Sequence, residues 1–177
     1  MRIRGCIALM MGIASFLVAD PSDSRLSFAD ALFRRGIYDL ALREYFQFLQ
    51  DQPDHPLSDA VWFRCGECYR ALGNSSAADR AWMRVTGSGG GPWKARAALR
   101  RSELLREAGR NEEAVGLLKE MLASNPPAEE AAEALFWLGD ALEKTGRFSE
   151  AVQSYERLSG LYSNSVFAVY GMLAEGT

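Results

Sequence analysis

Glycines recur at a nearly constant spacing along this 177-residue chain, and this repeat constrains the fold more than any other feature. The glycines are Gly36, Gly73, Gly109 and Gly146, separated by 37, 36 and 37 residues. An alanine follows each glycine by five positions, and a bulky side chain stands four positions further on. The alanines are Ala41, Ala78, Ala114 and Ala151, and the bulky residues are Tyr45, Trp82, Leu118 and Tyr155. A period of this length indicates an array of similar structural units.

The last unit shows what each repeat encodes. One stripe of an α-helix, at i, i+3, i+4 and i+7, is formed by Leu135, Leu138, Gly139 and Leu142. Gly146 can adopt the left-handed conformation that ends a helix. A second amphipathic helix is marked by Phe148, Ala151, Val152, Tyr155 and Leu158. Each unit is therefore predicted to be a helical hairpin, in which a small residue permits close helix approach and a bulky one fills the groove.

These residues resemble the tetratricopeptide repeat family, whose signature is Trp-x2-Leu-Gly-x2-Tyr followed by Ala-x3-Phe. The second repeat carries it at Trp62, Cys65, Gly66, Tyr69, Ala78 and Trp82, and the fourth at Leu135, Leu138, Gly139, Leu142, Ala151 and Tyr155. The first and third repeats depart from it, with Arg25 and Ala98 at the aromatic position and Arg101 at the leucine position. The longer period is similar to that of bacterial envelope variants, including outer-membrane β-barrel assembly lipoproteins and Tol-Pal coordinators.

The resemblance implies an all-α fold: an α-solenoid of about four helical hairpins, wound as a right-handed superhelix. We expect the repeats at about residues 22–55, 59–90, 95–126 and 132–163, and a C-terminal capping helix at 166–175. The cap is suggested by Val166, Phe167, Val169, Tyr170, Met172 and Leu173, which supply apolar surface at the end of the stack. A homotypic or partner contact at this apolar end is the alternative.

The N-terminal residues 1–19 have the pattern of a secretory signal peptide. Two arginines precede an uncharged stretch from Gly5 to Ala19, which falls short of the ~20 residues needed to span a bilayer. We therefore expect cleavage after Ala19 and a location in the periplasm or cell envelope, or secretion. A retained segment acting as a membrane anchor is the alternative. A lipoprotein is disfavoured, because Cys6 lies at the start of this stretch and no cysteine stands at its end, where a lipid would be attached.

The charge of the chain argues against nucleic acid as a partner. Residues 1–19 hold Arg2 and Arg4 and no acid, so residues 20–177 carry 18 basic and 23 acidic side chains, a net charge of −5. Such a balance provides no overall attraction for phosphate backbones. The expected partner is a protein or peptide, and a membrane is expected only if residues 1–19 are retained.

Cys65 and Cys68 form a Cys-x-x-Cys motif, which could be a redox pair or half of a zinc site. The sequence provides no second ligand pair for zinc. Both cysteines lie inside the predicted helix rather than at its N-terminus, where the dipole would activate a thiol. We favour a structural reading in which Cys65 occupies the apolar position of the repeat; a thiol redox or metal protein is kept as an alternative.

An enzymatic function is not expected from this sequence. The only histidine, His55, stands between two prolines in a predicted turn. The glycine-rich stretch at residues 86–92 lacks the Gly-Lys-Ser/Thr of a phosphate-binding loop. We therefore predict no catalytic residues, no cofactor and no metal site.

We call the first helix of each hairpin the leading helix. Beside the stripe that packs within the hairpin, each leading helix has a second face that is left free. With Leu135 as the fourth position of its repeat, this face carries positions five, nine and twelve. Position five holds Leu26, Phe63, Leu99 and Phe136, and position nine holds Asp30, Glu67, Glu103 and Asp140. The neighbouring edge carries Arg34, Arg70, Arg106 and Lys144. By the resemblance, this face lines the concave groove in which peptides or helices are bound.

Two interpretations of this face are open. Apolar and acidic rows beside arginines suit a peptide held by hydrophobic anchors and by charge, with Leu26, Asp30, Phe63, Glu67, Arg70, Leu99, Glu103, Arg106, Phe136 and Asp140 as its contacts. Alternatively, the acids and bases pair with each other as a structural ladder. We predict a non-enzymatic adaptor of the periplasm or cell envelope; a membrane-anchored accessory factor in outer-membrane assembly is the alternative.

Overall fold

The computed structural model describes residues 21–88 and 91–169. The predicted signal peptide at residues 1–19 and the part of the predicted cap at residues 170–175 lie outside the described residues. The helices are α1 (Pro21–Arg34), α2 (Tyr38–Asp51), α3 (Ser58–Ala71), α4 (Ser75–Gly87), α5 (Pro92–Glu107), α6 (Asn111–Ala123), α7 (Ala128–Lys144) and α8 (Phe148–Leu161). A further helical segment begins at Val166 and continues to the end of the described chain.

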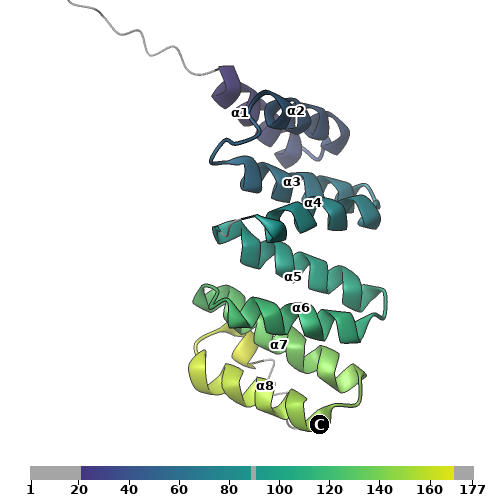
Figure 1. Ribbon diagram of the computed structural model, residues 1–177, viewed down its shortest axis with the longest axis vertical. Helices are drawn as coiled ribbons and strands as arrows, with labels where there is room; N and C mark the ends of the chain where they lie inside the picture. Colours follow the sequence, from purple (N-terminus) through teal and green to yellow (C-terminus); the bar gives the residue numbers. More distant parts are fainter. Residues whose placement is uncertain (1–20, 89–90, 170–177) are drawn as a thin grey trace, which may run out of the picture.

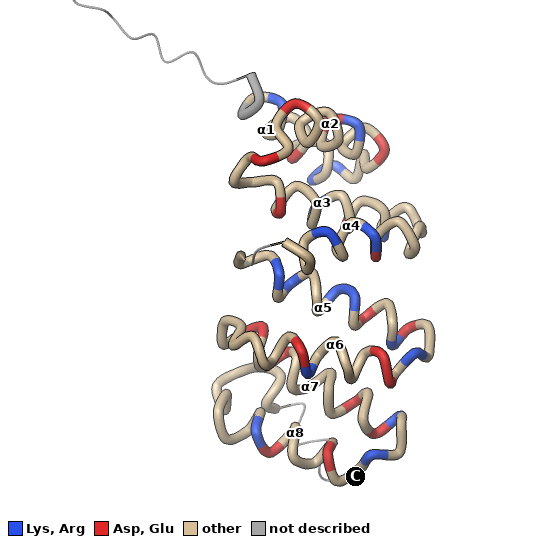
Figure 2. Tube along the Cα trace, viewed as in Figure 1, with Lys and Arg blue, Asp and Glu red and all other residues tan. Residues whose placement is uncertain are grey.

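Consecutive helices pair as four hairpins, α1–α2, α3–α4, α5–α6 and α7–α8, which stack one upon the next along the long axis of the molecule (Figure 1). No strand is present in the ranges that the structure covers. The predicted all-α solenoid of four hairpins is confirmed. Basic and acidic residues are interspersed along the whole stack rather than gathered at one end (Figure 2).

Two leading helices begin earlier than the repeat pattern suggests. α5 starts at Pro92 and α7 at Ala128, rather than near residues 95 and 132. Pro92 stands in the first turn of α5, where its missing N–H leaves no bond unmade. Pro127 occupies the N-cap of α7. The prolines therefore fix where these helices start, ahead of the first residue with the helical apolar period.

The turn within each hairpin is closed by the repeating glycine, as predicted. Gly36, Gly73, Gly109 and Gly146 all have φ between 71° and 75°, in the left-handed region. In the last hairpin the Arg147 N–H then donates to the Leu142 carbonyl over 2.9 Å. This bond spans the helix end and satisfies a carbonyl that would otherwise lack a partner. The same bond recurs in the other three turns.

Close approach of the two helices in a hairpin depends on a second set of small residues. A Cβ at Gly66 would overlap the Trp82 ring, and one at Gly139 would overlap the Tyr155 ring. Trp82 and Tyr155 are themselves almost completely buried. The small residue on the leading helix therefore makes the space that the bulky residue of the second helix fills.

The core runs along the stack instead of forming one centre. One cluster joins the last two hairpins through residues of four helices, among them Leu99, Leu118, Leu138 and Tyr155. Another joins the first two hairpins through Leu32, Tyr45, Phe48, Val61 and Cys65. Each hairpin thus buries apolar surface both within itself and against its neighbours, as expected for a repeat array. The leading helices also contact each other, α3 with α5 and α5 with α7, and their shared side is called the leading-helix face below.

Candidate interaction surface

The apolar row predicted for the leading-helix face is only partly brought together. Phe63 and Leu99 line one pocket of about 280 Å³ between α3, α5 and α7, together with Arg96, Arg100, Glu129, Glu130 and Glu133. Leu26 packs instead against the cluster of the first two hairpins. Phe136 contacts Trp137 and Phe167 near the C-terminal end, with ring centroids 4.8 and 5.9 Å apart. The row is therefore continuous across two repeats, where it forms a pocket.

Phe63 and Leu99 differ in how much of each side chain is exposed to this pocket. Leu99 is only 5% exposed and belongs to the core cluster of the last two hairpins. Phe63 is half-buried, with its ring 5.1 Å from the ring of Trp93 at the start of α5. Both side chains of the apolar wall are therefore also packed against the rest of the fold.

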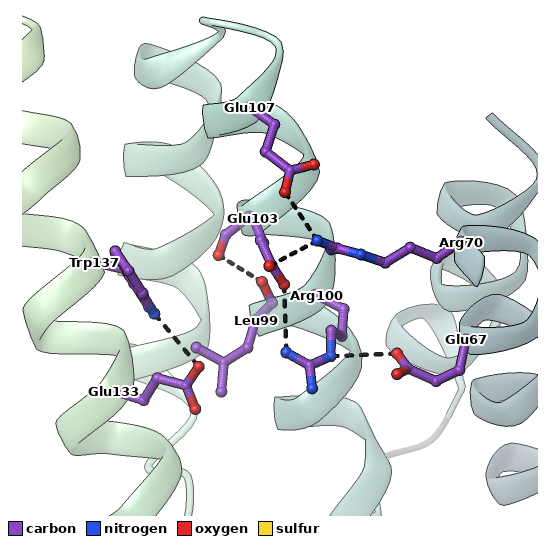
Figure 3. A network of polar contacts seen from close by, with 9 residues as sticks. Glu67, Arg70, Leu99, Arg100, Glu103, Glu107, Glu133 and Trp137 are labelled. Atoms are coloured by element: carbon purple, nitrogen blue, oxygen red, sulfur yellow. Dashed lines mark hydrogen bonds and ion pairs between the residues drawn. The ribbon is translucent and has the colours of Figure 1, made fainter. Parts of the chain in front are cut away.

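The acidic row is paired with arginines from neighbouring leading helices. Glu67 on α3 accepts a bond from Arg100 on α5 at 3.2 Å, and Arg70 on α3 donates to Glu103 on α5 at 2.8 Å (Figure 3). Arg100 and Glu103 are themselves paired at 3.3 Å, so these four side chains form one network. Asp30 and Asp140 continue the pattern at the two ends of the row.

At the N-terminal end, Asp30 accepts a bond from the Tyr45 hydroxyl at 2.7 Å and pairs with Arg64 of α3 at 3.3 Å. At the other end, Asp140 pairs with Lys144 at 2.9 Å and lies 3.8 Å from Arg106 of α5. Every acid of the predicted row thus has a basic partner in the structure. The geometry is that of the structural ladder.

Burial changes the protonation equilibria along this ladder. Partial burial raises the pKa of Glu67, and the charge and hydrogen bond of Arg100 oppose that effect. Burial also lowers the pKa of the Arg106 guanidinium, against the attraction of Asp140. Arg100 therefore favours the charged form of Glu67, whereas the Arg106 guanidinium stays charged at neutral pH.

Several contacts of this face were not predicted from the sequence. Arg64 and Arg100 provide the partners of Asp30 and Glu67, and they occupy equivalent positions of the second and third repeats. Arg96 pairs at 3.0 Å with Glu130, which is only 8% exposed. The sequence signal for all three pairs is an arginine 33 or 34 residues from an acid, one repeat length less a helical turn.

The cysteine pair is part of the core. Cys65 and Cys68 are free thiols that are completely buried in the cluster of the first two hairpins. Burial raises the pKa of Cys68 to about 12 and that of Cys65 further still. Both thiols are therefore protonated at neutral pH, and the thiolate needed for redox chemistry is not favoured. Among the described side chains, no three His, Cys, Asp or Glu residues are grouped to hold a metal.

The comparison with protein families decides the classification. The sequence profile described as "Tetratricopeptide repeat" matches residues 26–92, 69–129 and 99–166, which together cover most of the chain. The chain belongs to the tetratricopeptide repeat family. Tetratricopeptide repeats are associated with protein–protein interaction, so the protein is classed with interaction scaffolds. A search of curated proteins gave no match.

Solved tetratricopeptide repeat structures share the fold at low sequence identity. A tetratricopeptide repeat protein from Parabacteroides merdae has a TM-score of 0.72 at 20% identity; the match covers 85% of this chain and 57% of that structure. MamA from Desulfovibrio magneticus RS-1 has a TM-score of 0.66 at 17% identity, with 89% and 86% covered. A putative kinesin light chain of Podosopora anserina with TPR-like repeats has a TM-score of 0.61 at 19% identity, with 89% of each chain covered.

In residues 21–88 and 91–169, each helix is too short or too polar to cross a bilayer. The longest, α7, has 17 residues and carries acidic residues in its first turn.

Proposed function

We propose that this tetratricopeptide repeat protein is a non-enzymatic adaptor that binds a segment of a partner protein on the leading-helix face. The observation that carries the proposal is the pocket where Phe63 and Leu99, which occupy the same position of successive repeats, meet between α3, α5 and α7. An apolar wall in a surface pocket provides the anchor site of a typical protein interface.

The polar rim of this pocket favours a particular kind of partner segment. Glu129 is exposed at the start of α7 and makes no hydrogen bond or ion pair with the described residues. Glu133 accepts only a long bond from the Trp137 ring, at 3.4 Å. These carboxylates suit a segment with a basic residue beside an apolar anchor, because charge complementarity fixes the register of such a segment. The paired acids deeper in the ladder then hold the shape of the face.

We further propose that the adaptor acts in the bacterial periplasm or cell envelope. This part rests on residues 1–19, whose two arginines and uncharged stretch have the pattern of an export signal. Expression of the full chain in a bacterial host, followed by fractionation and N-terminal sequencing, tests it. The expected result is a periplasmic protein that begins at Asp20, whereas a cytoplasmic protein that retains Met1 contradicts it.

Binding at the pocket is tested with a photo-crosslinking residue at Arg96 in living cells. We expect a specific adduct from this position, and loss of the adduct when Glu129→Arg reverses the charge of the rim. Glu156→Arg on α8 is the matched control, because Glu156 is also an exposed acid and does not line the pocket. An adduct that survives Glu129→Arg, or disappears equally with Glu156→Arg, contradicts the proposal.

Charge reversal inside the ladder separates the two roles of the acids. Glu103→Arg places one positive charge beside Arg70 and Arg100, which are also positive, so we expect a lower unfolding midpoint. If the ladder is structural, the adduct at Arg96 persists at temperatures below that midpoint. Loss of the adduct in a fully folded Glu103→Arg variant assigns this acid to ligand binding instead.

A further inference from the structure

A second cleft lies on the opposite side of α5, between α4 and α6. It has a volume of about 220 Å³, and its walls include Met83, Ala95, Ala98, Leu117, Glu120 and Met121. Successive helix residues are about 100° apart, so Ala98 and Arg101 face this cleft while Leu99 and Arg100 face the pocket on the leading-helix face. The cleft is therefore separate from the surface proposed above.

The repeat register shows why the cleft exists. Ala98 precedes its turn glycine by the same interval as Trp62 in the second repeat and Leu135 in the fourth. The Trp62 ring lies between two second helices, 5.7 Å from the ring of Phe46 on α2 and 4.6 Å from the guanidinium of Arg84 on α4. The third repeat has an alanine at this place. It therefore keeps the walls of the site but lacks the side chain that fills it.

The equivalents of the two Trp62 neighbours are present in the cleft. Met83 stands where Phe46 stands one repeat earlier, and Glu120 stands where Arg84 stands. Phe46 is half-buried beside Trp62, whereas Met83 is 47% exposed because nothing covers it. Glu120 is exposed and makes no hydrogen bond or ion pair with another described residue. The cleft therefore has an uncovered apolar wall and a free hydrogen-bond acceptor at its rim.

We propose that this cleft binds the indole of a tryptophan presented by a partner protein, which takes the place that Trp62 occupies within the chain. Dry cavities of about 150 Å³ already hold a benzene ring, so the volume suffices for an aromatic side chain. Met83 and Met121 provide flexible walls and favourable sulfur–aromatic contacts. Glu120 selects indole over the phenyl ring of phenylalanine, because the indole N–H donates and the carboxylate accepts.

The test is a titration of the full chain, labelled with ¹³C at the methionine methyl groups, with N-acetyl-tryptophanamide. We expect the signals of Met83 and Met121 to shift and to saturate with a dissociation constant in the millimolar range, which a single fragment of this size reaches. N-acetyl-leucinamide is the control and should shift these signals much less. Equal shifts with both compounds, or no shift of Met83 and Met121, overturn the proposal.

Variants at Ala98 and Glu120 test the basis of binding. Ala98→Trp should abolish the shifts, because the indole of the variant fills the cleft itself. Ala98→Leu, which copies Leu135 of the fourth repeat, should also weaken binding. This smaller substitution keeps the test valid if Ala98→Trp prevents folding. Glu120→Gln should weaken binding about three- to tenfold, the effect of losing a charged hydrogen-bond acceptor. Unchanged affinity in a folded Ala98→Leu variant rules out this site.

Discussion

The guanidinium of Arg106 lies over the indole of Trp137, with its central carbon 3.6 Å from the ring centroid. This contact joins α5 to α7 on the leading-helix face. The Arg106 side chain is only 10% exposed, and its Nε and Nη1 atoms have no hydrogen-bond acceptor. The charge is therefore held by the aromatic ring and by Asp140 at 3.8 Å rather than by a direct hydrogen bond.

We predict that Arg106 and Trp137 are energetically coupled. A double-mutant cycle with Arg106→Ala and Trp137→Ala, measured by urea unfolding, should give a coupling free energy of about 1–2 kcal/mol. Arg106→Lys should recover only part of the lost stability, because an ammonium keeps the charge but not the planar stacking surface. A coupling energy near zero would show that the stack adds nothing beyond the burial of each side chain.

A second prediction concerns the small residue at the centre of each hairpin. Gly66→Ala should destabilise the protein by about 1–3 kcal/mol, the usual cost of overpacking. The Trp82 ring cannot move away freely, because its Nε1 donates to the Phe63 carbonyl at 3.1 Å. Gly139→Ala should cost less, since the first repeat already combines an alanine at the equivalent position, Ala29, with Tyr45. Thermal or urea unfolding measures both.

The third repeat suggests a control for the Gly66→Ala variant and a second substitution that should restore its stability. Gly116 lies on the exposed side of α6 with open space around its Cβ position, so Gly116→Ala should stabilise by about 0.5–1 kcal/mol. Trp82→Leu should relieve Gly66→Ala, because the third repeat pairs Ser102 with Leu118. If Gly66→Ala and Gly116→Ala shift the unfolding midpoint in the same direction, close packing at Gly66 is not the cause of the change.

The hairpins could be predicted from the sequence because their determinants are local. A left-handed glycine such as Gly146 ends a helix whatever surrounds it, and the small and bulky residues at Gly139 and Tyr155 meet within one hairpin. The ion pairs could not be assigned in the same way. The partner of Glu67 is Arg100 on the next hairpin, and this choice depends on the tilt between successive leading helices. The interval of 33 or 34 residues becomes a useful signal only once that tilt is known.

The cleft beside Ala98 and the pocket at Phe63 and Leu99 could likewise be predicted only in part from the sequence. The sequence marks Ala98 as a departure from the repeat, but a small residue leaves a cleft only if neighbouring side chains do not move in. The structure shows that Met83 and Met121 remain apart around it. Phe63 and Leu99 were predicted to share a face, and they meet because α3, α5 and α7 are successive neighbours. Leu26 and Phe136 are drawn into clusters at the two ends of the stack.

A third prediction is that two glutamates respond to pH in opposite directions. Burial raises the pKa of Glu67, whereas hydrogen bonds from Lys119 and then Arg147 lower the pKa of Glu150. Glu67 therefore contributes stability that is complete below the pKa of unfolded glutamate, ~4.3, and lost as the pH rises through its raised value. Glu150 contributes stability that is present above ~4.3 and lost as the pH falls through its lowered value.

Urea unfolding of wild type, Glu67→Gln and Glu150→Gln from strongly acidic to neutral pH tests these signs. Wild type should lose its advantage over Glu67→Gln as the pH rises, and its advantage over Glu150→Gln as the pH falls. NMR titration of the carboxyl carbons measures the pKa of each glutamate. If the stability differences between wild type and the two variants change in the same direction with pH, the environments assigned to these glutamates are contradicted.

The last prediction is that Cys65 and Cys68 are inert in the native protein. Both are completely buried, and burial holds the pKa of the Cys68 thiol at about 12. Alkylation by iodoacetamide at mildly alkaline pH, followed by peptide mass mapping, should label these positions only in step with the unfolded fraction as urea is raised. Rapid labelling without urea, or a native disulfide between the two, would instead support thiol chemistry. Because α3 also carries Phe63 and Glu67, slow labelling in turn reports that the leading-helix face keeps its packing.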